Sequence, residues 1–244
     1  MNPSEDLIIP EWPAPPNVRA FQTTRRGGVS AAPYDSLNLG DHVGDNPLNV
    51  MRNRMLLAKL LPSEPVWLEQ VHGIAVADAD MDSCRPVADA CIARRGVCVV
   101  MTADCLPVLL CDRQGTVVGA VHAGWRGLAA GVIEAAVEKM AVAPGNLMAW
   151  LGPAIGPESF EVGCEVRDAF VALDRNAACA FAPCGQDKYL ADICKLAKMR
   201  LNALGIFDVF GGNSCTFLES GRFFSYRRDG ATGRQGTFIW LDPV

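Results

Sequence analysis

Short apolar runs, separated by turns rich in glycine and proline, dominate the pattern of hydrophobic and polar positions along the chain. The β-branched and aliphatic side chains in these runs predict strands rather than helices. We predict strands at residues 18–24, 66–71, 74–77, 97–101, 108–111, 117–121, 147–151, 207–210, 222–226 and 237–241. Residues 36–40 alternate between apolar and polar positions and are predicted to be either a strand or a loop.

Helical periodicity appears between these runs. Asn46 followed by Pro47 is typical of a helix start, and Met51 and Met55 then lie on one apolar face. Further helices are predicted at residues 128–142, 165–173 and 190–204, the last of them ending at Gly205. Because no long linker or repeat divides the chain, we predict one α+β domain over residues 18–244, preceded by a proline-rich segment at residues 1–17.

Composition narrows the class of protein. Half of the 244 residues are apolar and 20% are charged, which excludes a disordered chain. A net charge of −5 argues against nonspecific nucleic-acid binding, which requires a basic face. The first 16 residues carry acids and prolines instead of a signal peptide's basic start and apolar run, and no apolar run is long enough to span a bilayer. We expect a cytoplasmic monomer with neither nucleic-acid nor membrane partners.

The ten cysteines contain no C-x-x-C pair, so we predict neither a structural zinc knuckle nor a thioredoxin-type motif. Without an export signal, most of these cysteines are expected to be reduced and to behave as small buried hydrophobic residues.

Two of the three histidines end apolar runs and lie close to glycine, which allows a ligand to approach the backbone. These are His72 and His122, and between them Cys105 lies in a polar segment that interrupts two predicted strands. One thiolate and two imidazoles are the ligand set of an open catalytic zinc site. The same residues could instead form a cysteine nucleophile with a histidine base. His42 lies in a polar glycine-rich loop and is not expected to be a ligand.

Polar residues beside these positions are candidates for supporting roles. Asp104 precedes Cys105, and a buried carboxylate there would need partners, so it could orient a histidine. The segment H-A-G-W-R-G leads from His122 toward a predicted helix, and free amides together with Arg126 would suit an anion such as phosphate. An ordinary glycine turn is the alternative interpretation of that segment.

Seven motifs, taken together and in order, resemble those of the YfiH family. Its bacterial members are also called polyphenol oxidase or laccase-domain proteins and include the peptidoglycan editing factor. The motifs are T-R-R-G-G-V-S (24–30), S-L-N-L-G (36–40), W-L-E-Q-V-H-G (67–73), M-T-A-D-C-L-P-V (101–108), A-V-H-A-G-W-R-G (120–127), L-G-P-A-I-G (151–156) and F-S-Y-R-R-D (224–229). The match extends from about Phe21 to Leu241, with no departure at the motif positions.

The resemblance implies an α+β fold with central sheets and outer helices, similar to the catalytic domain of cytotoxic necrotizing factor toxins. It also implies that a metal, usually zinc, is held by His72, Cys105 and His122; copper has been linked to the oxidase label. Three histidines cannot furnish the several copper centres of a laccase, which favours zinc.

The family's activities are phosphorolysis of purine nucleosides (adenosine, inosine, guanosine and methylthioadenosine) and deamination of adenosine. By resemblance we therefore predict a zinc-dependent purine nucleoside phosphorylase with adenosine deaminase activity, with nucleosides and phosphate as its small-molecule partners. The candidate substrate contacts are polar side chains inside the motifs: Arg25, Asn38, Gln70, Arg126 and Arg227. An amide hydrolase that edits peptidoglycan precursors, with Cys105 as nucleophile and His122 as base, is the alternative; a copper polyphenol oxidase and a binding protein with incidental activity are less favoured.

Overall fold

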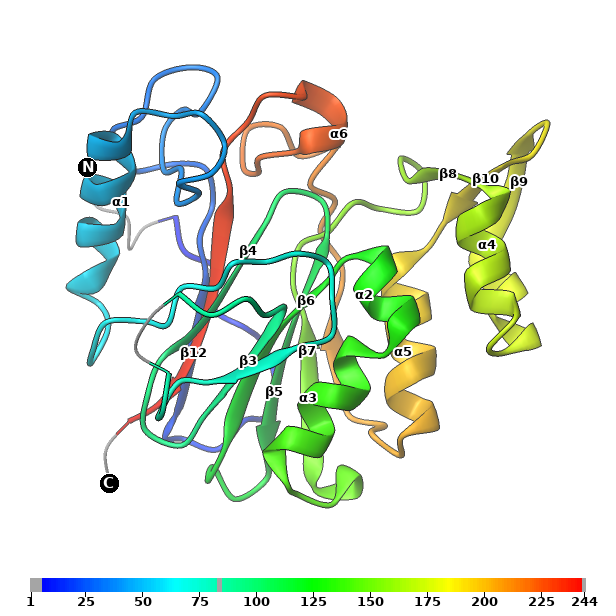
Figure 1. Ribbon diagram of the computed structural model, residues 1–244, viewed down its shortest axis with the longest axis horizontal. Coiled ribbons are helices and arrows are strands. Elements are labelled where there is room, and N and C mark those ends of the chain that lie inside the picture. Colours follow the sequence, from blue (N-terminus) through cyan, green and yellow to red (C-terminus); the bar gives the residue numbers. More distant parts are fainter. Residues whose placement is uncertain (1–5, 83–84, 243–244) are drawn as a thin grey trace.

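Two β-sheets pack face to face between layers of helices in the computed structural model, which describes residues 6–82 and 85–242 (Figure 1). The smaller sheet is antiparallel and has the order β1 (Val18–Gln22), β12 (Gln235–Leu241), β4 (Cys98–Thr102). The larger sheet is mixed and has the order β11 (Val209–Gly211), β7 (Leu147–Leu151), β5 (Leu106–Asp112), β6 (Val118–Ala123), β3 (Ala90–Ala93), β2 (Val76–Asp78).

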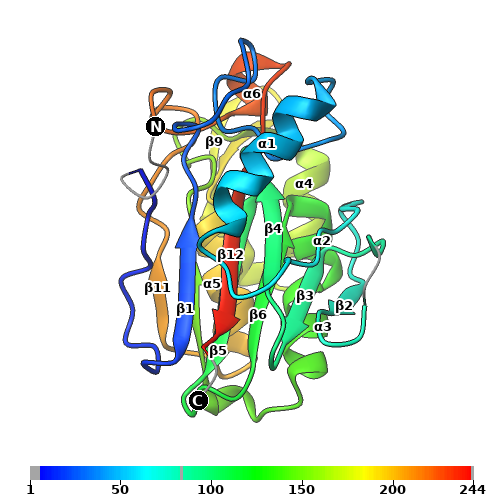
Figure 2. The same cartoon turned by 90° about the vertical axis from the view of Figure 1, so that its left-hand side faces the viewer.

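Apolar side chains from the facing sides of both sheets fill the space between them, among them Val100 and Ile239 from the smaller sheet and Leu109 from the larger. Helix α1 (Pro47–Ala58) covers the outer face of the smaller sheet, where Leu57 shares a core cluster with Phe238 (Figure 2). The outer face of the larger sheet is covered by α2 (Trp125–Ala130), α3 (Val132–Met140) and α5 (Ile193–Ala203). Where one α+β domain was predicted, the structure is a mixed α/β domain with three sheets.

The third sheet projects beside the larger one together with α4 (Cys164–Val171), as Figure 1 shows. Its order is β8 (Glu161–Gly163), β10 (Lys188–Ala191), β9 (Phe181–Gly185), and the 3₁₀ helix η3 (Arg175–Ala180) precedes β9. These short strands were not predicted from the sequence, because most of the β9 side chains are exposed and give no apolar run.

Several predicted elements differ from the structure. The helix predicted at residues 128–142 is two helices, because Gly131 has a φ of 103° and separates α2 from α3. The 3₁₀ helix η2 (Pro144–Asn146) follows α3. The helix predicted to begin at residue 190 begins at Ile193, where the Asp192 side chain caps it by accepting from the Lys195 amide.

Other predicted strands form no ladder. Residues 36–40 are a loop, and residues 66–71 contribute only isolated bridges from Val66 and Glu69. The strand predicted at residues 222–226 is wrong, since those residues lead into a short helix, α6 (Tyr226–Asp229). Within the described ranges, no helix is long and apolar enough to cross a membrane.

The N-terminal segment is tied to the smaller sheet. Ile8 forms an antiparallel bridge with Gln22, and the side chains of Ile8 and Trp12 pack against the core between the sheets. The part of this segment that the structure describes therefore extends the packed body.

Candidate metal centre

Three donor side chains come together where the two central sheets are joined. Residues 103–105 connect β4 of the smaller sheet to β5 of the larger one, which places Cys105 at the crossing point. His122 lies near the end of β6, opposite Pro107 of β5, and His72 comes from the loop before β2. The donor atoms of the three residues all lie within 4.8 Å of one another, and His72 Nε2 is 3.7 Å from Cys105 Sγ.

A buried carboxylate organises this cluster. Asp89 is fully buried, and its Oδ1 is 2.8 Å from His122 Nδ1, which leaves His122 Nε2 as the nitrogen available to a metal. The same carboxylate accepts from the backbone amides of Val71, His72 and Gly73, at 3.2, 2.9 and 2.6 Å respectively. One side chain thus fixes the ring of one candidate ligand and the backbone of the other.

Asp89 was not predicted from the sequence, because a single acid at the start of an apolar strand carries no chemical signature of its own. The signal that could have found it is strand pairing. Ala90 lies opposite Val121 in the antiparallel β3–β6 ladder, so Asp89 must lie beside His122.

Gly124 makes room for the donors. A Cβ atom at this position would lie 2.6 Å from His72 Cδ2, closer than packed atoms approach, and 3.1 Å from Cys105 Sγ, which is tighter than most packed contacts. Gly124 therefore serves a steric purpose, because a side chain there would displace the His72 ring and crowd the Cys105 sulfur.

Charge in the cluster favours a thiolate. Burial by itself raises the pKa of the Cys105 thiol, but His122 and His72 outweigh it and lower that pKa to about 6. Burial likewise lowers the pKa of His122, but the Cys105 thiolate and the Asp89 carboxylate raise it to about 9. Without a metal the two groups are therefore a thiolate and an imidazolium, and a metal ion would take the place of the imidazolium proton.

Asp104 does not orient a histidine in this structure. Its carboxylate accepts from the Thr216 hydroxyl at 2.7 Å and from the Arg227 amide at 2.7 Å. The histidine partner is Asp89, because β3 lies beside β6 whereas Asp104 faces the segment around α6. Asp104 instead ties the turn that carries Cys105 to that segment.

Two of the expected substrate contacts, Asn38 and Gln70, are occupied by internal hydrogen bonds. Asn38 is fully buried, and its amide group bonds to Gly40, Asp45 and the Arg234 amide. Gln70 exchanges two hydrogen bonds with the backbone of Met101, which ties the loop before β2 to β4. These contacts use much of the hydrogen-bonding capacity of both side chains inside the fold, and their role as substrate contacts stays a prediction.

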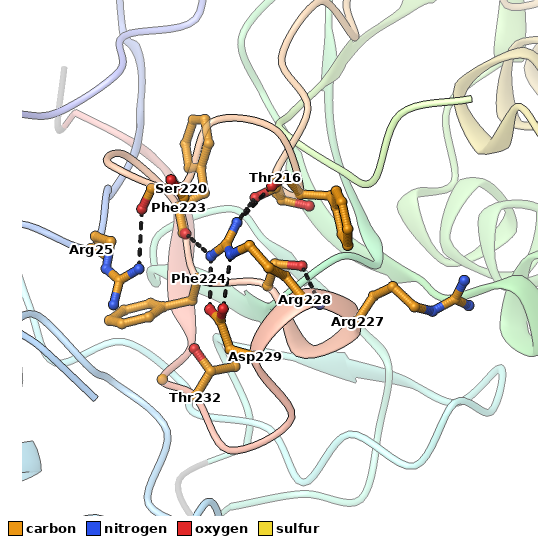
Figure 3. Close-up of polar contacts among 12 residues, drawn as sticks. Arg25, Thr216, Ser220, Phe223, Phe224, Arg227, Arg228, Asp229 and Thr232 are labelled. Atoms are coloured by element: carbon orange, nitrogen blue, oxygen red, sulfur yellow. Dashed lines mark hydrogen bonds and ion pairs between the residues drawn. The ribbon is translucent and has the colours of Figure 1, made fainter. Parts of the chain in front are cut away.

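Arg25 is also engaged. Its guanidinium donates to the carbonyl oxygens of Asp35 and Ser220 and to the Asp35 carboxylate, and it lies 4.9 Å from the centre of the Phe224 ring. Figure 3 shows Arg25 directed at Ser220 rather than toward Arg227.

The two arginines of α6 differ from each other. Arg228 uses all five of its N–H donors on the Asp229 carboxylate and on backbone carbonyls (Figure 3). Arg227 points away from that cluster, donates to the Glu161 carbonyl at 2.8 Å, and so links α6 to the third sheet. Arg126 is exposed, and its guanidinium lies 4.5 Å from the centre of the Trp125 ring.

Among residues 6–82 and 85–242, His72, Cys105 and His122 form the one group of three or more side chains that could hold a metal ion. His42 lies outside this group and contacts Asp41 at 3.5 Å. The three donors can hold a metal ion and leave further coordination positions to smaller ligands.

The chain is similar to known proteins over nearly its whole length. A family model described as "Multi-copper polyphenol oxidoreductase laccase" matches residues 19–242. The chain is 57% identical over 240 residues to "Purine nucleoside phosphorylase YfiH" of Escherichia coli (strain K12), which covers 96% of this chain and 98% of that protein. The chain belongs to the YfiH family.

A second YfiH-family relative, "Purine nucleoside phosphorylase PA4543" of Pseudomonas aeruginosa, is 54% identical over 236 residues, covering 96% of this chain and 98% of the relative. The crystal structure of Neisseria meningitidis protein NMB0706 is similar with a TM-score of 0.96 and 50% identity, covering 98% of this chain and all of that one (100%). The family membership predicted from the seven motifs is confirmed, and the three-sheet fold is that of a solved relative.

Proposed function

We propose that this YfiH-family protein is a zinc-dependent purine nucleoside phosphorylase that also deaminates adenosine. The observation that carries the proposal is the convergence of His72, Cys105 and His122 on one point in a chain similar over nearly its whole length to proteins named purine nucleoside phosphorylases. The proposed substrates are adenosine, inosine, guanosine and methylthioadenosine, with phosphate as the second substrate.

The donor set fits zinc. One sulfur and two nitrogens from the protein, with a position left for a small ligand, is the arrangement of catalytic rather than structural zinc sites. The copper named in the family description fits less well, since a laccase needs several copper centres and the sequence contains three histidines. Bound zinc would supply a Lewis acid that polarises phosphate or water.

The protein's own residues prepare the site for that ion. Asp89 accepts the Nδ1 proton of His122, which fixes the tautomer whose Nε2 faces the metal position. The His122 and His72 rings favour ionised Cys105, so the thiolate ligand is present at neutral pH. Asp104, held by Thr216 and by the Arg227 amide, fixes the turn from which Cys105 projects.

Phosphorolysis places a further demand on the site. Phosphate attacks the anomeric carbon of the ribose while the purine departs, so an anion must be held against a sugar on which positive charge develops. A positively charged group near the metal centre is therefore required.

The test is to incubate the purified, metal-loaded protein with adenosine in the presence and absence of phosphate and to identify the products. Phosphorolysis predicts adenine and ribose 1-phosphate only when phosphate is present, whereas deamination to inosine needs only water. Equal release of adenine and free ribose in phosphate-free buffer would make the enzyme a hydrolase. Elemental analysis of the same preparation should give close to one zinc per chain.

The second candidate is an amide hydrolase acting on peptidoglycan precursors. The lowered pKa of Cys105, with His122 as base, is the observation that favours it. In that case a metal-free preparation would retain full activity and a covalent acyl group would accumulate on Cys105, neither of which a zinc phosphorylase predicts.

A further inference from the structure

Arg234 is placed beside the metal centre by strand pairing. It directly precedes β12, whose first residue, Gln235, lies opposite Thr102 at the end of β4. Because the ladder is antiparallel, Arg234 lies at the edge of the sheet from which residues 103–105 continue to Cys105. None of the seven family motifs includes this arginine.

The backbone of Arg234 is held by residues almost 200 positions earlier in the chain. Its amide donates to Asn38 Oδ1 at 2.9 Å, across a separation of 196 residues, and its carbonyl accepts from the Leu39 amide at 3.1 Å. The internal hydrogen bonds of the buried Asn38 amide therefore pair the S-L-N-L-G loop with the residue before β12.

The side chain of Arg234 is fixed as well. Its Nη1 donates to the carbonyl oxygens of Thr232 and Gly233, both at 3.0 Å. Its aliphatic stem lies over Gly40, where a Cβ atom would be 2.8 Å from Arg234 Cγ, so Gly40 must lack a side chain for the stem to lie there. The guanidinium carbon is 5.8 Å from the centre of the Tyr226 ring.

One edge of this fixed guanidinium remains available. Within the described ranges, Nε and Nη2 of Arg234 have no hydrogen-bond partner, and neither atom is sealed away from solvent. Arg228 provides the contrast, since its donors are all used within the fold. The Nε–Nη2 edge is the two-donor face that binds two oxygens of a phosphate at once.

The surroundings of Arg234 leave its guanidinium positively charged. Partial burial lowers the pKa of Arg234, and the nearby Cys105 thiolate and Asp104 carboxylate partly offset that effect. Arginine remains a cation under such conditions. The Asp104 carboxylate is already bonded to Thr216 and Arg227, and a metal ion would neutralise the thiolate, so neither group consumes the free edge of Arg234.

We propose that Arg234 binds the phosphate co-substrate through Nε and Nη2, with Asn38 and Gly40 acting as positioning residues for it. The role of that phosphate in nucleoside cleavage rests on the proposed function; the binding of the anion does not. Arg126, expected from the sequence to hold the anion, is less suited. Its helix α2 has six residues, and its exposed side chain is stacked on Trp125 rather than fixed by hydrogen bonds.

The test is calorimetric titration of inorganic phosphate into the metal-loaded protein without nucleoside, so that its result does not depend on phosphorolysis. Arg234→Ala should weaken phosphate binding by about 10- to 100-fold, the loss expected for charge-assisted hydrogen bonds. Arg234→Lys, which keeps the charge but loses the two-donor edge, should lie between that variant and the wild type. The matched control is Arg52→Ala, which removes an exposed arginine from α1 and should bind phosphate as the wild type does.

Metal content and melting temperature of each variant separate loss of the anion site from loss of the fold. If Arg234→Ala does not fold, Arg234→Lys and Gly40→Ala, which displaces the arginine stem, provide the same readout. Unchanged phosphate affinity in a folded Arg234 variant overturns the proposal, as does a loss seen in Arg126→Ala and absent in Arg234→Ala. An effect of Arg234→Ala confined to adenosine 5′-monophosphate, with inorganic phosphate unaffected, also overturns it.

Phosphorolysis is then assayed separately. If the variants lose phosphate affinity but the wild type releases no adenine with phosphate present, the anion site stands and the proposed function fails. If the wild type performs phosphorolysis and Arg234→Ala does so with an unchanged phosphate KM, the function stands and the role of Arg234 fails.

Discussion

The candidate metal centre and the arginine cluster around Arg228 are both polar regions built from family motifs, yet they use their polar atoms in opposite ways. Around Arg228, every guanidinium donor meets a backbone carbonyl or the Asp229 carboxylate (Figure 3). At the metal centre, the donor atoms of His72, Cys105 and His122 face one another within 4.8 Å. Such a group is electrostatically incomplete without a proton or a metal ion between its members.

The difference shows that the presence of a polar residue in a family motif does not by itself identify a substrate contact. Asn38, Gln70 and Arg25 satisfy most of their hydrogen-bonding capacity inside the fold. Arg234 lies outside the motifs, and two of its nitrogen atoms, Nε and Nη2, have no hydrogen-bond partner among the residues that the structure describes. The following predictions test this distinction between polar atoms that are used internally and those that are available.

The largest effect is expected for Cys105→Ser. A hydroxyl is a poor substitute for a thiolate ligand, so zinc affinity should fall by more than about 100-fold. That is the largest loss usually seen when a residue that hydrogen-bonds to a metal ligand is replaced. Metal content after dialysis and the phosphorolysis rate should fall together, with the melting temperature of the metal-free protein little changed. Full zinc occupancy together with lost activity would instead support the nucleophile role of Cys105.

Arg228→Ala should also have a large effect, but on stability rather than on zinc binding. Removing a guanidinium that makes five internal hydrogen bonds should lower the free energy of unfolding by about 2–4 kcal/mol. Chemical denaturation measures this loss, and the folded fraction should retain its zinc. Loss of zinc from protein that remains folded would show that the cluster and the metal centre are not separate.

Asp89→Asn tests the carboxylate that joins His122 to the His72 loop. The neutral amide accepts hydrogen bonds less strongly and does not fix the histidine tautomer, so zinc affinity should fall by about 10- to 100-fold. Competition with a coloured chelator measures the change. Asp104→Asn serves as the comparison, because Asp104 is next to Cys105 in the chain but contacts neither histidine. An equal loss of zinc affinity in both variants would contradict the specific role of the Asp89–His122 contact.

Asp112 lies at the end of β5 that is far from the candidate metal centre. Its carboxylate is used for internal hydrogen bonds, and the pH dependence of the free energy of unfolding tests their contribution. Burial by itself raises the pKa of this carboxyl, but hydrogen bonds from Val117 and Thr116 outweigh burial and hold the pKa below its usual value. The folded pKa is thus lower than the unfolded one. The stability it contributes is present above about pH 4 and is lost as the pH falls through the folded value.

Asp112→Asn should therefore lower the free energy of unfolding by about 1–2 kcal/mol at pH 7 and reduce its dependence on pH below about 4. Denaturation at a series of pH values measures both. A wild-type stability that did not change over this acid range would contradict the assignment.

The smallest effect is expected for His42→Ala. The imidazole is half exposed and lies outside the group of candidate ligands, so metal content should be unchanged and stability should shift by no more than about 0.5 kcal/mol. Loss of zinc from this variant would mean that a fourth protein ligand closes the site.

The sequence predicted the candidate metal ligands best, because these are metal-ligating residue types located at the ends of apolar runs. His72 and His122 follow apolar runs and Cys105 interrupts two of them, and these are the positions that the fold brings together. Asp89 could not be identified in the same way, because its partner is set by the β3–β6 register. Arg234 could not be identified either, because T-G-R-Q-G is indistinguishable from a turn until Asn38 is placed beside it.

The errors in the predicted secondary structure have a similar origin. Apolar patterning found β4, β5, β6 and β7 because these strands are buried along their whole length. It failed for β8–β10, which expose much of their surface, and for residues 222–226, where buried Phe223 and Phe224 belong to a loop. Burial produces apolar runs in strands and loops alike, and hydrogen bonding between distant segments decides between the two.

The position of β12 has a consequence for how the protein is made. This strand is the last element along the described chain, yet it lies between β1 and β4, and Arg234 is the residue that leads into it (Figure 2). During translation, β1 and β4 leave the ribosome long before the strand that joins them. A nascent chain can pair β5 with β6 and β7 early, but its smaller sheet, and with it the arginine beside the candidate metal centre, can be completed only after residues 235–241 have emerged. Ribosomes stalled before codon 235 should therefore display chains that resist protease in the larger sheet and remain sensitive in β1.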